Sequence, residues 1–324
     1  MIDADDLALL AVSFTAAMAR ESGAADADAA LHELGWGDLL ATAPTEGAAV
    51  AFAALGTTGS AACLLDDVVA NALGVGVRPD ACVVMPAPGR GAPAGTRDGS
   101  VIHVDGLVSA RIDNSERVVV PFEDDGRESG LVEVDAVLLR PPALPSLDPA
   151  RPYRRAVGDV RFDDARVVEV TGTWDVVVRN ARAALSHQLI AISRVMLEMA
   201  RRHALDRVQF GRPVASFQAV RHKLAEALVA IEGAASVAHA CAADDCDPLV
   251  ATMAKSLAGA AARSTAANAQ QVLAGIGFTT DHPFHLSLKR TMVIDTLFGS
   301  ARTLPAEIGH ILVARGSAPR LVEL

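Results

Sequence analysis

Residues 206–218, DRVQFGRPVASFQ, place an arginine, a phenylalanine and a Gly-Arg-Pro turn inside an alanine-rich part of the chain. Arg207 carries a rigid fork of donors that stay charged, and a pyrophosphate group requires donors of this kind. The alternative is that Phe210 belongs to a hydrophobic core and Arg207 to a surface ion pair. The segment alone does not decide between these readings.

Other residues with reactive side chains are not arranged for metal, redox or dinucleotide chemistry. His282 and His285 in HPFH have no nearby cysteine and no HExxH context, so no metal site is expected. The glycines of VQFGRP and LAGIGF do not form a GxGxxG turn after a strand, so a Rossmann site is not expected. Four cysteines match neither a zinc knuckle nor a CxxC pair: Cys63, Cys82, Cys241 and Cys246.

Composition excludes several classes of protein. The 324 residues are 51% hydrophobic but only 4% aromatic, which predicts a sizeable core packed mainly by Ala, Val and Leu. The formal net charge of -10 argues against a nucleic-acid partner. No apolar stretch reaches the ~18 residues of a membrane span. The acidic start MIDADDLALL is unlike a secretory signal, so we expect a cytoplasmic protein.

Three zones follow one another along the chain. Residues 1–75 show helical spacing of apolar residues, with glycines where helices would end. Residues 76–172 contain short β-prone runs between turn signals and predict a small, mostly antiparallel β-domain. Residues 173–324 carry long apolar stripes at helical spacing, which predict an antiparallel four-helix bundle. The expected fold class is α+β, mainly α, with three domains at these boundaries.

Two segments of the third zone resemble the acyl-CoA dehydrogenase family. ALDRVQFGRPVASFQAVRHKLAE is similar to the flavin-binding signature of that family, and QQVLAGIGFTTDHPFHLSLKR resembles its second signature without a gap. The resemblance is specific over residues 173–324 and rests mainly on domain order over residues 1–172. It implies an N-terminal helical domain, a middle β-domain and a C-terminal four-helix bundle.

The resemblance also implies FAD as cofactor. In the family, the arginine and phenylalanine of RxxFG reach across a dimer interface to the flavin dinucleotide of the neighbouring subunit. The matching FAD-binding positions here are Arg207, Phe210, Gln218, Gln271 and Gly275. Ala274 replaces the first glycine of the usual pair.

The family removes an α-proton with a positioned glutamate, and this chain lacks it at both known places. The base position near the C-terminus holds Phe298, and the alternative position on the first long helix holds Ala181. Arg182 matches an arginine that lines the acyl-CoA pocket in the family. In this chain Arg182 either binds substrate or serves in packing or an ion pair. Asp295 is a possible displaced base, although a solvated or ion-paired side chain is the simpler reading.

The flavin-facing strand also departs from the family. The tryptophan-containing strand aligns with GLVSARID, which leaves Ala110 or Arg111 facing the flavin, and Arg302 stands at a position that is normally acidic or amide. This combination resembles the non-catalytic subunit of actinobacterial heterotetrameric acyl-CoA dehydrogenases, which oxidise bulky acyl-CoA thioesters such as steroid side chains. It implies FAD shared with a catalytic partner subunit and an acyl-CoA substrate. Two alternatives stay open: a self-sufficient homo-oligomeric dehydrogenase that uses Asp295, and an acyl-CoA-binding scaffold without flavin.

Overall fold

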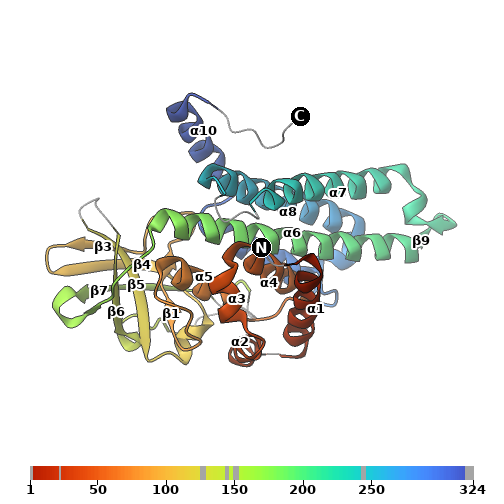
Figure 1. Ribbon diagram of the computed structural model, residues 1–324. Coiled ribbons are helices and arrows are strands. Elements are labelled where there is room, and N and C mark those ends of the chain that lie inside the picture. The colour runs from red at the N-terminus through yellow and green to blue at the C-terminus, as the bar shows by residue number, and fades with distance from the viewer. Residues whose placement is uncertain are drawn as a thin grey trace.

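The computed structural model describes residues 3–21, 23–124, 129–142, 146–148, 153–241 and 246–317 (Figure 1). Helices come first, a mixed sheet follows, and a second set of helices ends the described chain. The predicted class, α+β and mainly α, is therefore confirmed. No helix in the described ranges is long and apolar enough to cross a membrane.

The first region consists of short helices, and two of them end at a glycine. The helices are α1 Ala4–Arg20, α2 Ala24–Glu33, α3 Trp36–Thr42, α4 Pro44–Thr58 and α5 Leu64–Leu73. Gly59 after α4 and Gly74 after α5 have φ values of 71° and 77°. Glycine adopts this left-handed conformation without a Cβ penalty, so it ends both helices cleanly.

The middle region is an eight-stranded sheet with both parallel and antiparallel pairs. The strands are β1 Cys82–Val83, β2 Met85–Pro86, β3 Gly95–Asp98, β4 Val101–Val108, β5 Arg117–Asp124, β6 Ser129–Asp135, β7 Arg154–Arg161 and β8 Arg166–Val167. Most pairs are antiparallel, as predicted, but β1 and β3 both pair in parallel with β5. Strand β6 ends at Asp135, because a 3-10 turn covers the next residues, Ala136–Leu138.

The last region is built on three long helices that run along one another in Figure 1. Its helices are α6 Trp174–Asp206, α7 Gln218–His239, α8 Pro248–Leu273, α9 Phe284–Thr296 and α10 Leu304–Arg315. Helix α8 packs against both α6 and α7, while α4 of the first region packs against α6. Helix α9 is an addition to the four helices expected from the sequence.

Small side chains allow these helices to approach closely, in line with the low aromatic content. Ala181 and Ala184 on α6 and Ala254 and Ala258 on α8 are fully buried. Gly56 on α4 shows how tight the crossing is, because a Cβ there would lie 2.5 Å from the carbonyl oxygen of Gln188 on α6. The bundle is therefore held by close backbone contact rather than by large interlocking rings.

Candidate functional site

A two-residue hairpin closes the end of the bundle between α6 and α7. Strands β9 Val208–Gln209 and β10 Arg212–Pro213 are joined by Phe210 and Gly211, whose φ values are 54° and 79°. Two left-handed residues in succession are typical of a type I′ turn. Phe210 is 92% exposed, so the reading that it belongs to a hydrophobic core is wrong.

Phe210 belongs to a small aromatic cluster on the outside of the hairpin. Its ring lies 6.1 Å from that of Phe217 in an edge-to-face arrangement, and the guanidinium of Arg212 lies 4.4 Å from the Phe217 ring centre. These contacts fix the hairpin while leaving most of the Phe210 ring in solvent.

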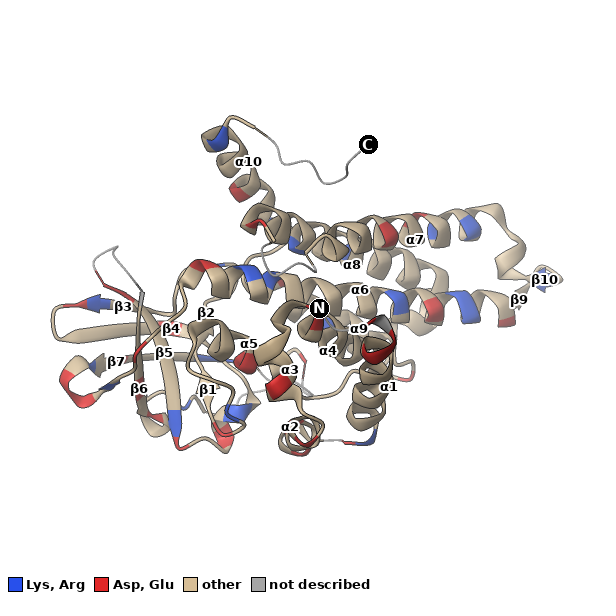
Figure 2. Cartoon of the chain, in the orientation of Figure 1, with Lys and Arg blue, Asp and Glu red and all other residues tan. Residues whose placement is uncertain are grey.

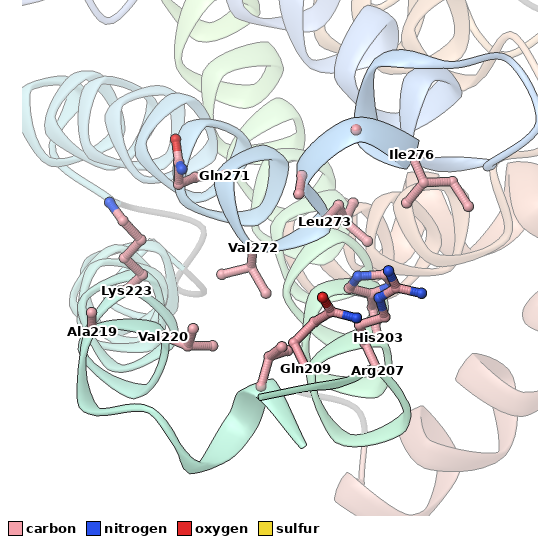
Figure 3. A pocket seen from close by; sticks show the side chains of 13 residues that line it. His203, Arg207, Gln209, Ala219, Val220, Lys223, Gln271, Val272, Leu273 and Ile276 are labelled. Carbon is pink, nitrogen blue, oxygen red and sulfur yellow. The ribbon is translucent and has the colours of Figure 1, made fainter. Parts of the chain in front are cut away.

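A cavity of about 630 Å³ lies beside this hairpin, between the ends of α6, α7 and α8 (Figure 3). Its lining residues are His203, Arg207, Gln209, Val214, Ala219, Val220, Lys223, Gln271, Val272, Leu273, Ala274, Gly275 and Ile276. The two signature segments, which span residues 204–226 and 270–290, thus form one site. We call this cavity the bundle-end pocket.

Three of the five predicted FAD-binding residues line the bundle-end pocket, namely Arg207, Gln271 and Gly275. Phe210 and Gln218 do not line it. The side-chain amide of Gln218 lies 3.3 Å from the imidazole of His222 at the exposed start of α7. A cofactor role of these two residues therefore stays a prediction about a second chain.

The cation of the first signature is available for a ligand. Arg207 follows the last residue of α6 and is exposed, and no carboxylate of the described ranges lies within ion-pair distance of it. The surface ion pair weighed from the sequence is therefore not found in the part of the chain that the structure describes.

The second signature contributes an open backbone and an unusual alanine. A Cβ added to Gly275 would meet no atom within 4 Å, so the backbone there is open to an approaching group. Ala274 has φ 54° and ψ −136°, a conformation that glycine adopts readily and alanine only with strain. The substitution of the first glycine by alanine therefore leaves strain at the edge of the pocket.

The sequence reading missed Lys223 and His203, which also line the pocket. Lys223 is one helical turn from Ala219, so i,i+4 spacing on α7 was a usable signal. His203 is in the last turn of α6, and its pKa is lowered, first by burial and then by the neighbouring His282 and Arg207. No comparable sequence signal marks His203.

The position expected to hold a catalytic base is filled and tied down. Phe298 is buried and stacks on Trp174 with 6.3 Å between ring centres, and its carbonyl oxygen accepts a hydrogen bond from Nε of Arg182 at 3.0 Å. Ala181, the alternative position, is fully buried. Neither side chain can accept a proton.

Arg182 forms an ion pair within the chain. Its two terminal nitrogens donate to the carboxylate of Glu307 at 2.7 and 2.8 Å, and one of them also donates to Oγ1 of Thr252 at 2.7 Å. The guanidinium is buried. Of the two readings of Arg182, the ion pair is the one seen, and nothing in this geometry supports the substrate role.

The loop that follows α9 is held by a buried lysine. Nζ of Lys255 donates to the carbonyl oxygens of Asp295 at 3.0 Å and Gly299 at 3.1 Å, and burial lowers the pKa of the ammonium to about 8. Asp295 itself is buried rather than solvated. Its Oδ1 accepts the N–H of Ala301 at 3.0 Å, and its Oδ2 lies 3.8 Å from Arg263. Asp295 is therefore fixed as a loop support and an ion-pair partner.

A glycine-rich turn after β2 packs onto this loop from the sheet side. The N–H of Gly89 donates to the carbonyl of Thr296 at 2.8 Å, and Nε1 of Trp174 donates to the carbonyl of Gly91 at 2.7 Å. We call this whole arrangement around Phe298, Arg182 and Lys255 the filled region.

The side chain of Arg111, in the 3-10 turn Ala110–Asp113 that follows β4, points into the protein. Arg111 is buried and binds two carboxylates, Asp28 through Nη2 at 2.9 Å and Asp67 through Nη1 at 2.6 Å. Asp67 also accepts Nε1 of Trp36 at 3.0 Å, and burial raises the pKa of the adjacent Asp66 to about 6. These contacts join the sheet to the first helices, so of Ala110 and Arg111, the two residues expected at the flavin-facing position, Arg111 is engaged within the chain.

Two other positions noted in the sequence have simple structural roles. Nδ1 of His282 accepts the N–H of Phe284 at 3.2 Å and so helps to begin α9. Arg302 is exposed in the turn before α10.

Comparison with known proteins finds similarity over the helical region that contains both signature segments. Residues 176–310 match the family described as acyl-CoA dehydrogenase, C-terminal domain. The chain is 35% identical over 173 residues to acyl-CoA dehydrogenase FadE34 of Mycobacterium tuberculosis, and 37% identical over 131 residues to acyl-CoA dehydrogenase IpdE2 of the same organism.

These matches cover 52% and 40% of this chain but only 24% of FadE34 and 39% of IpdE2. A match over nearly the full chain comes from the crystal structure of the ChsE4–ChsE5 complex of Mycobacterium tuberculosis, with a TM-score of 0.74, 21% identity and 99% coverage of both chains. Residues 176–310 are therefore similar to the C-terminal domain of acyl-CoA dehydrogenases, and the chain as a whole has the acyl-CoA dehydrogenase fold.

Proposed function

We propose that this chain is the non-catalytic subunit of a heteromeric, FAD-dependent acyl-CoA dehydrogenase. In this proposal a partner subunit supplies the base that deprotonates the acyl-CoA thioester, and this chain helps to hold the FAD.

The observation that carries the proposal is the contrast between the positions of the catalytic base and the bundle-end pocket. Phe298 and Ala181 are buried apolar side chains at the base positions, whereas Arg207 and Gln271 face an open pocket.

The residues present fit one end of FAD. Arg207 offers charged donors to a diphosphate, Gln271 offers an amide, and Gly275 leaves room for close approach. The other end does not fit within this chain, because Arg111 is turned away and bound to Asp28 and Asp67. FAD, when bound, accepts the hydride that leaves the β-carbon of the thioester.

Likeness to known proteins supports a partner. The solved relative named above is a complex of two differently named chains, ChsE4 and ChsE5. FadE34 and IpdE2 are acyl-CoA dehydrogenases by name, which supports an acyl-CoA thioester as the substrate. We therefore assign the catalytic partner to the same family, and place the assembly in the cytoplasm.

The geometry does not support Asp295 as an alternative catalytic base. Asp295 is buried in a loop contact and accepts the N–H of Ala301, so its carboxylate is already engaged. A base must lie within hydrogen-bond reach of the proton that it removes. Substitution of Asp295 should accordingly change the stability of the loop and leave the partner's chemistry in place.

Purification with and without the partner tests the proposal. The chain alone should carry no flavin absorbance and form no enoyl-CoA, whereas co-expression with its catalytic acyl-CoA dehydrogenase partner should give a yellow, active complex. Bound FAD together with turnover by this chain alone contradicts the proposal. An active complex without flavin absorbance, or a complex that binds acyl-CoA without turnover, contradicts it as well.

Arg207→Ala sharpens the test of the interface. The variant should lower the ratio of FAD to protein in the purified complex, because the diphosphate loses a charged donor. Arg201→Ala is a matched control, since Arg201 is in the last two turns of α6, close to Arg207 in the chain, and is paired with Glu198 at 2.6 Å. Equal flavin content in the two variants would remove the cofactor role from Arg207.

A further inference from the structure

The turn between α7 and α8 brings two cysteines together. Cys241 directly follows Ala240, the C-cap of α7, and Cys246 directly precedes Asp247, the N-cap of α8. Both are buried free thiols in one hydrophobic cluster. The thiol of Cys241 donates a hydrogen bond to the sulfur of Cys246, which raises the pKa of Cys241 and lowers that of Cys246. The two sulfurs are thus neighbours, although their spacing matches no CxxC motif, and we call them the thiol pair.

The surroundings favour a thiolate at Cys246. The hydrogen bond from Cys241 lowers its pKa most. The cation of Arg179 on α6 and the N–H of Ala251 on α8 lower the pKa further, against burial and the carboxylate of Asp247. Figure 2 shows basic residues on the first turns of α6, on the side of the bundle from which α10 projects. Cys246 is also the more exposed member of the pair, at 8% against 1% for Cys241.

The other two cysteines have surroundings that suppress a thiolate. Cys63 and Cys82 are buried beside Ser109, whose hydroxyl oxygen lies 3.9 Å from Sγ of Cys82. Burial raises the pKa of Cys63 to about 12 and that of Cys82 well above its ordinary value, and the carboxylate of Asp66 raises both further. Since the thiolate is the nucleophilic form of cysteine, these two residues are an internal control for the thiol pair.

We propose that Cys241 and Cys246 form a reversible redox site that closes into a disulfide when the chain meets hydrogen peroxide. The thiolate of Cys246 attacks one oxygen of the peroxide, the O–O bond breaks, and a sulfenic acid and one water are formed. Sγ of Cys241 then displaces the sulfenic hydroxyl, which takes up the thiol proton and leaves as a second water. The pair loses two electrons and two protons, and these reduce one hydrogen peroxide to two waters.

A disulfide here acts next to a contact that holds α10. Asp247 accepts the N–H of Leu249 at 2.8 Å and so caps α8. The same carboxylate accepts two hydrogen bonds, of 2.5 and 2.9 Å, from Arg315 at the end of α10. Because Cys246 is joined directly to Asp247, oxidation fixes the backbone that carries this carboxylate. The thiol pair lies at the other end of α7 from the bundle-end pocket, so its chemistry is independent of the function proposed above.

The two pairs of cysteines fall on separate tryptic peptides. Trypsin releases residues 224–255 as one peptide that carries only Cys241 and Cys246. The other two cysteines lie together on residues 21–90, because trypsin does not cut the Arg-Pro bond within that stretch. The purified native chain is exposed to hydrogen peroxide, denatured in an alkylating reagent, digested without reductant and analysed by mass spectrometry.

Peptide 224–255 should become two hydrogen atoms lighter and escape alkylation. It should do so at least roughly tenfold faster than peptide 21–90, because the thiolate fraction changes about tenfold for each unit of pKa. Treatment with dithiothreitol before denaturation should restore both thiols. Absence of the lighter peptide, or equal rates of oxidation for the two peptides, overturns the proposal, and this test needs no substitution that could disturb the fold.

Serine variants assign the roles of the two sulfurs. C241S should accumulate a sulfenic acid at Cys246 that dimedone labels, because the sulfur that resolves it is gone. C246S should leave Cys241 unlabelled, since Cys241 is the protonated partner. C63S is the matched control and should form the disulfide as the native chain does. Stronger labelling of Cys241 in C246S than of Cys246 in C241S overturns the assignment of Cys246 as the attacking sulfur.

Hydrogen exchange measures the effect on the fold. The backbone amides of α10 should exchange more slowly in the oxidised native chain than in the reduced one, because the carboxylate that binds Arg315 is held on a more rigid turn. C246S exposed to the same peroxide should show no slowing. Equal exchange in the two oxidation states of the native chain overturns the coupling of the thiol pair to α10.

Discussion

The two ends of the bundle treat their polar groups in opposite ways. At the bundle-end pocket, Arg207 and Lys223 have no carboxylate partner within the described ranges. In the filled region, Arg182 and Lys255 are buried and every contact that they make is internal. Unpaired donors mark a surface meant for a ligand, whereas satisfied donors hold a fold together.

Residues with a strained backbone lie both at the bundle-end pocket and in the filled region. Phe210, Ala274 and Phe298 are the non-glycine residues with positive φ among those described, each at 54°. Phe210 is exposed and Phe298 is buried, so the same unfavourable conformation has different compensation. Around Phe298 the surrounding hydrogen bonds offset the strain. At the pocket, the edge-to-face contact with Phe217 leaves the Phe210 ring largely in solvent, so we expect a ligand or partner to supply further compensation for Phe210 and Ala274.

The largest expected loss of stability comes from comparing Arg182 on α6 with Arg207, which directly follows α6. Arg182→Met removes the partner of Glu307 and leaves the carbonyl of Phe298 without its donor. We expect a loss of about 2–3 kcal/mol of unfolding free energy, at the lower end for a buried pair because Glu307 is 44% exposed. Arg207→Met should change stability by less than about 0.5 kcal/mol. Urea unfolding of both variants measures the difference, and equal losses would contradict the contrast between the regions.

The contribution of Lys255 to the free energy of unfolding depends on pH. Burial lowers the pKa of its ammonium from 10.5 to about 8, so between pH 8 and 10.5 the unfolded chain binds more protons than the folded chain at this residue. The contribution of Lys255 to stability therefore rises with pH through that window, by about 3 kcal/mol at most, and is lost as the pH falls.

The difference in unfolding free energy between the native chain and Lys255→Met isolates this contribution, because other groups titrate alike in both. It should grow in favour of the native chain from pH 8 to 10.5. A constant difference across this window for Lys255→Met would mean that the ammonium is not perturbed.

Local patterns in the sequence predicted the bundle-end pocket far better than the filled region. The order of helices and strands follows from apolar spacing and glycine positions, and the pairing of Arg207 with Gln271 in one pocket follows from two signatures in register. Both signals are short-range or repeat a known pattern, so they are visible without the fold.

The contacts of the filled region, and those of Arg111, join distant parts of the chain. Arg182 and Glu307 are 125 residues apart, Arg111 and Asp28 are 83 apart, and Arg111 and Asp67 are 44 apart. No periodicity connects such positions. The sequence shows which family side chains are missing at Ala181 and Phe298, but only the folded chain shows what closes the space around them.

Relief of strain at Ala274 tests the pocket with a smaller effect. Ala274→Gly removes a Cβ from a conformation that favours glycine, and we expect about 1 kcal/mol of added stability. Urea unfolding of the isolated chain measures it. Destabilisation would show that the methyl group packs favourably enough to outweigh its backbone conformation.

The smallest expected change in stability separates folding from binding at the hairpin. Phe210→Asn keeps a residue that tolerates positive φ in the type I′ turn and removes an exposed ring, so unfolding free energy should rise by about 0.5 kcal/mol or stay the same. The FAD content of the complex with the partner should nevertheless fall, because the ring is positioned for a second chain. Phe217→Leu is the control, since it alters the neighbouring ring without touching the tip. A variant Phe210→Asn that is as stable as the native chain and retains full flavin would leave the strained, exposed ring without a function and would break the contrast between the two ends of the bundle.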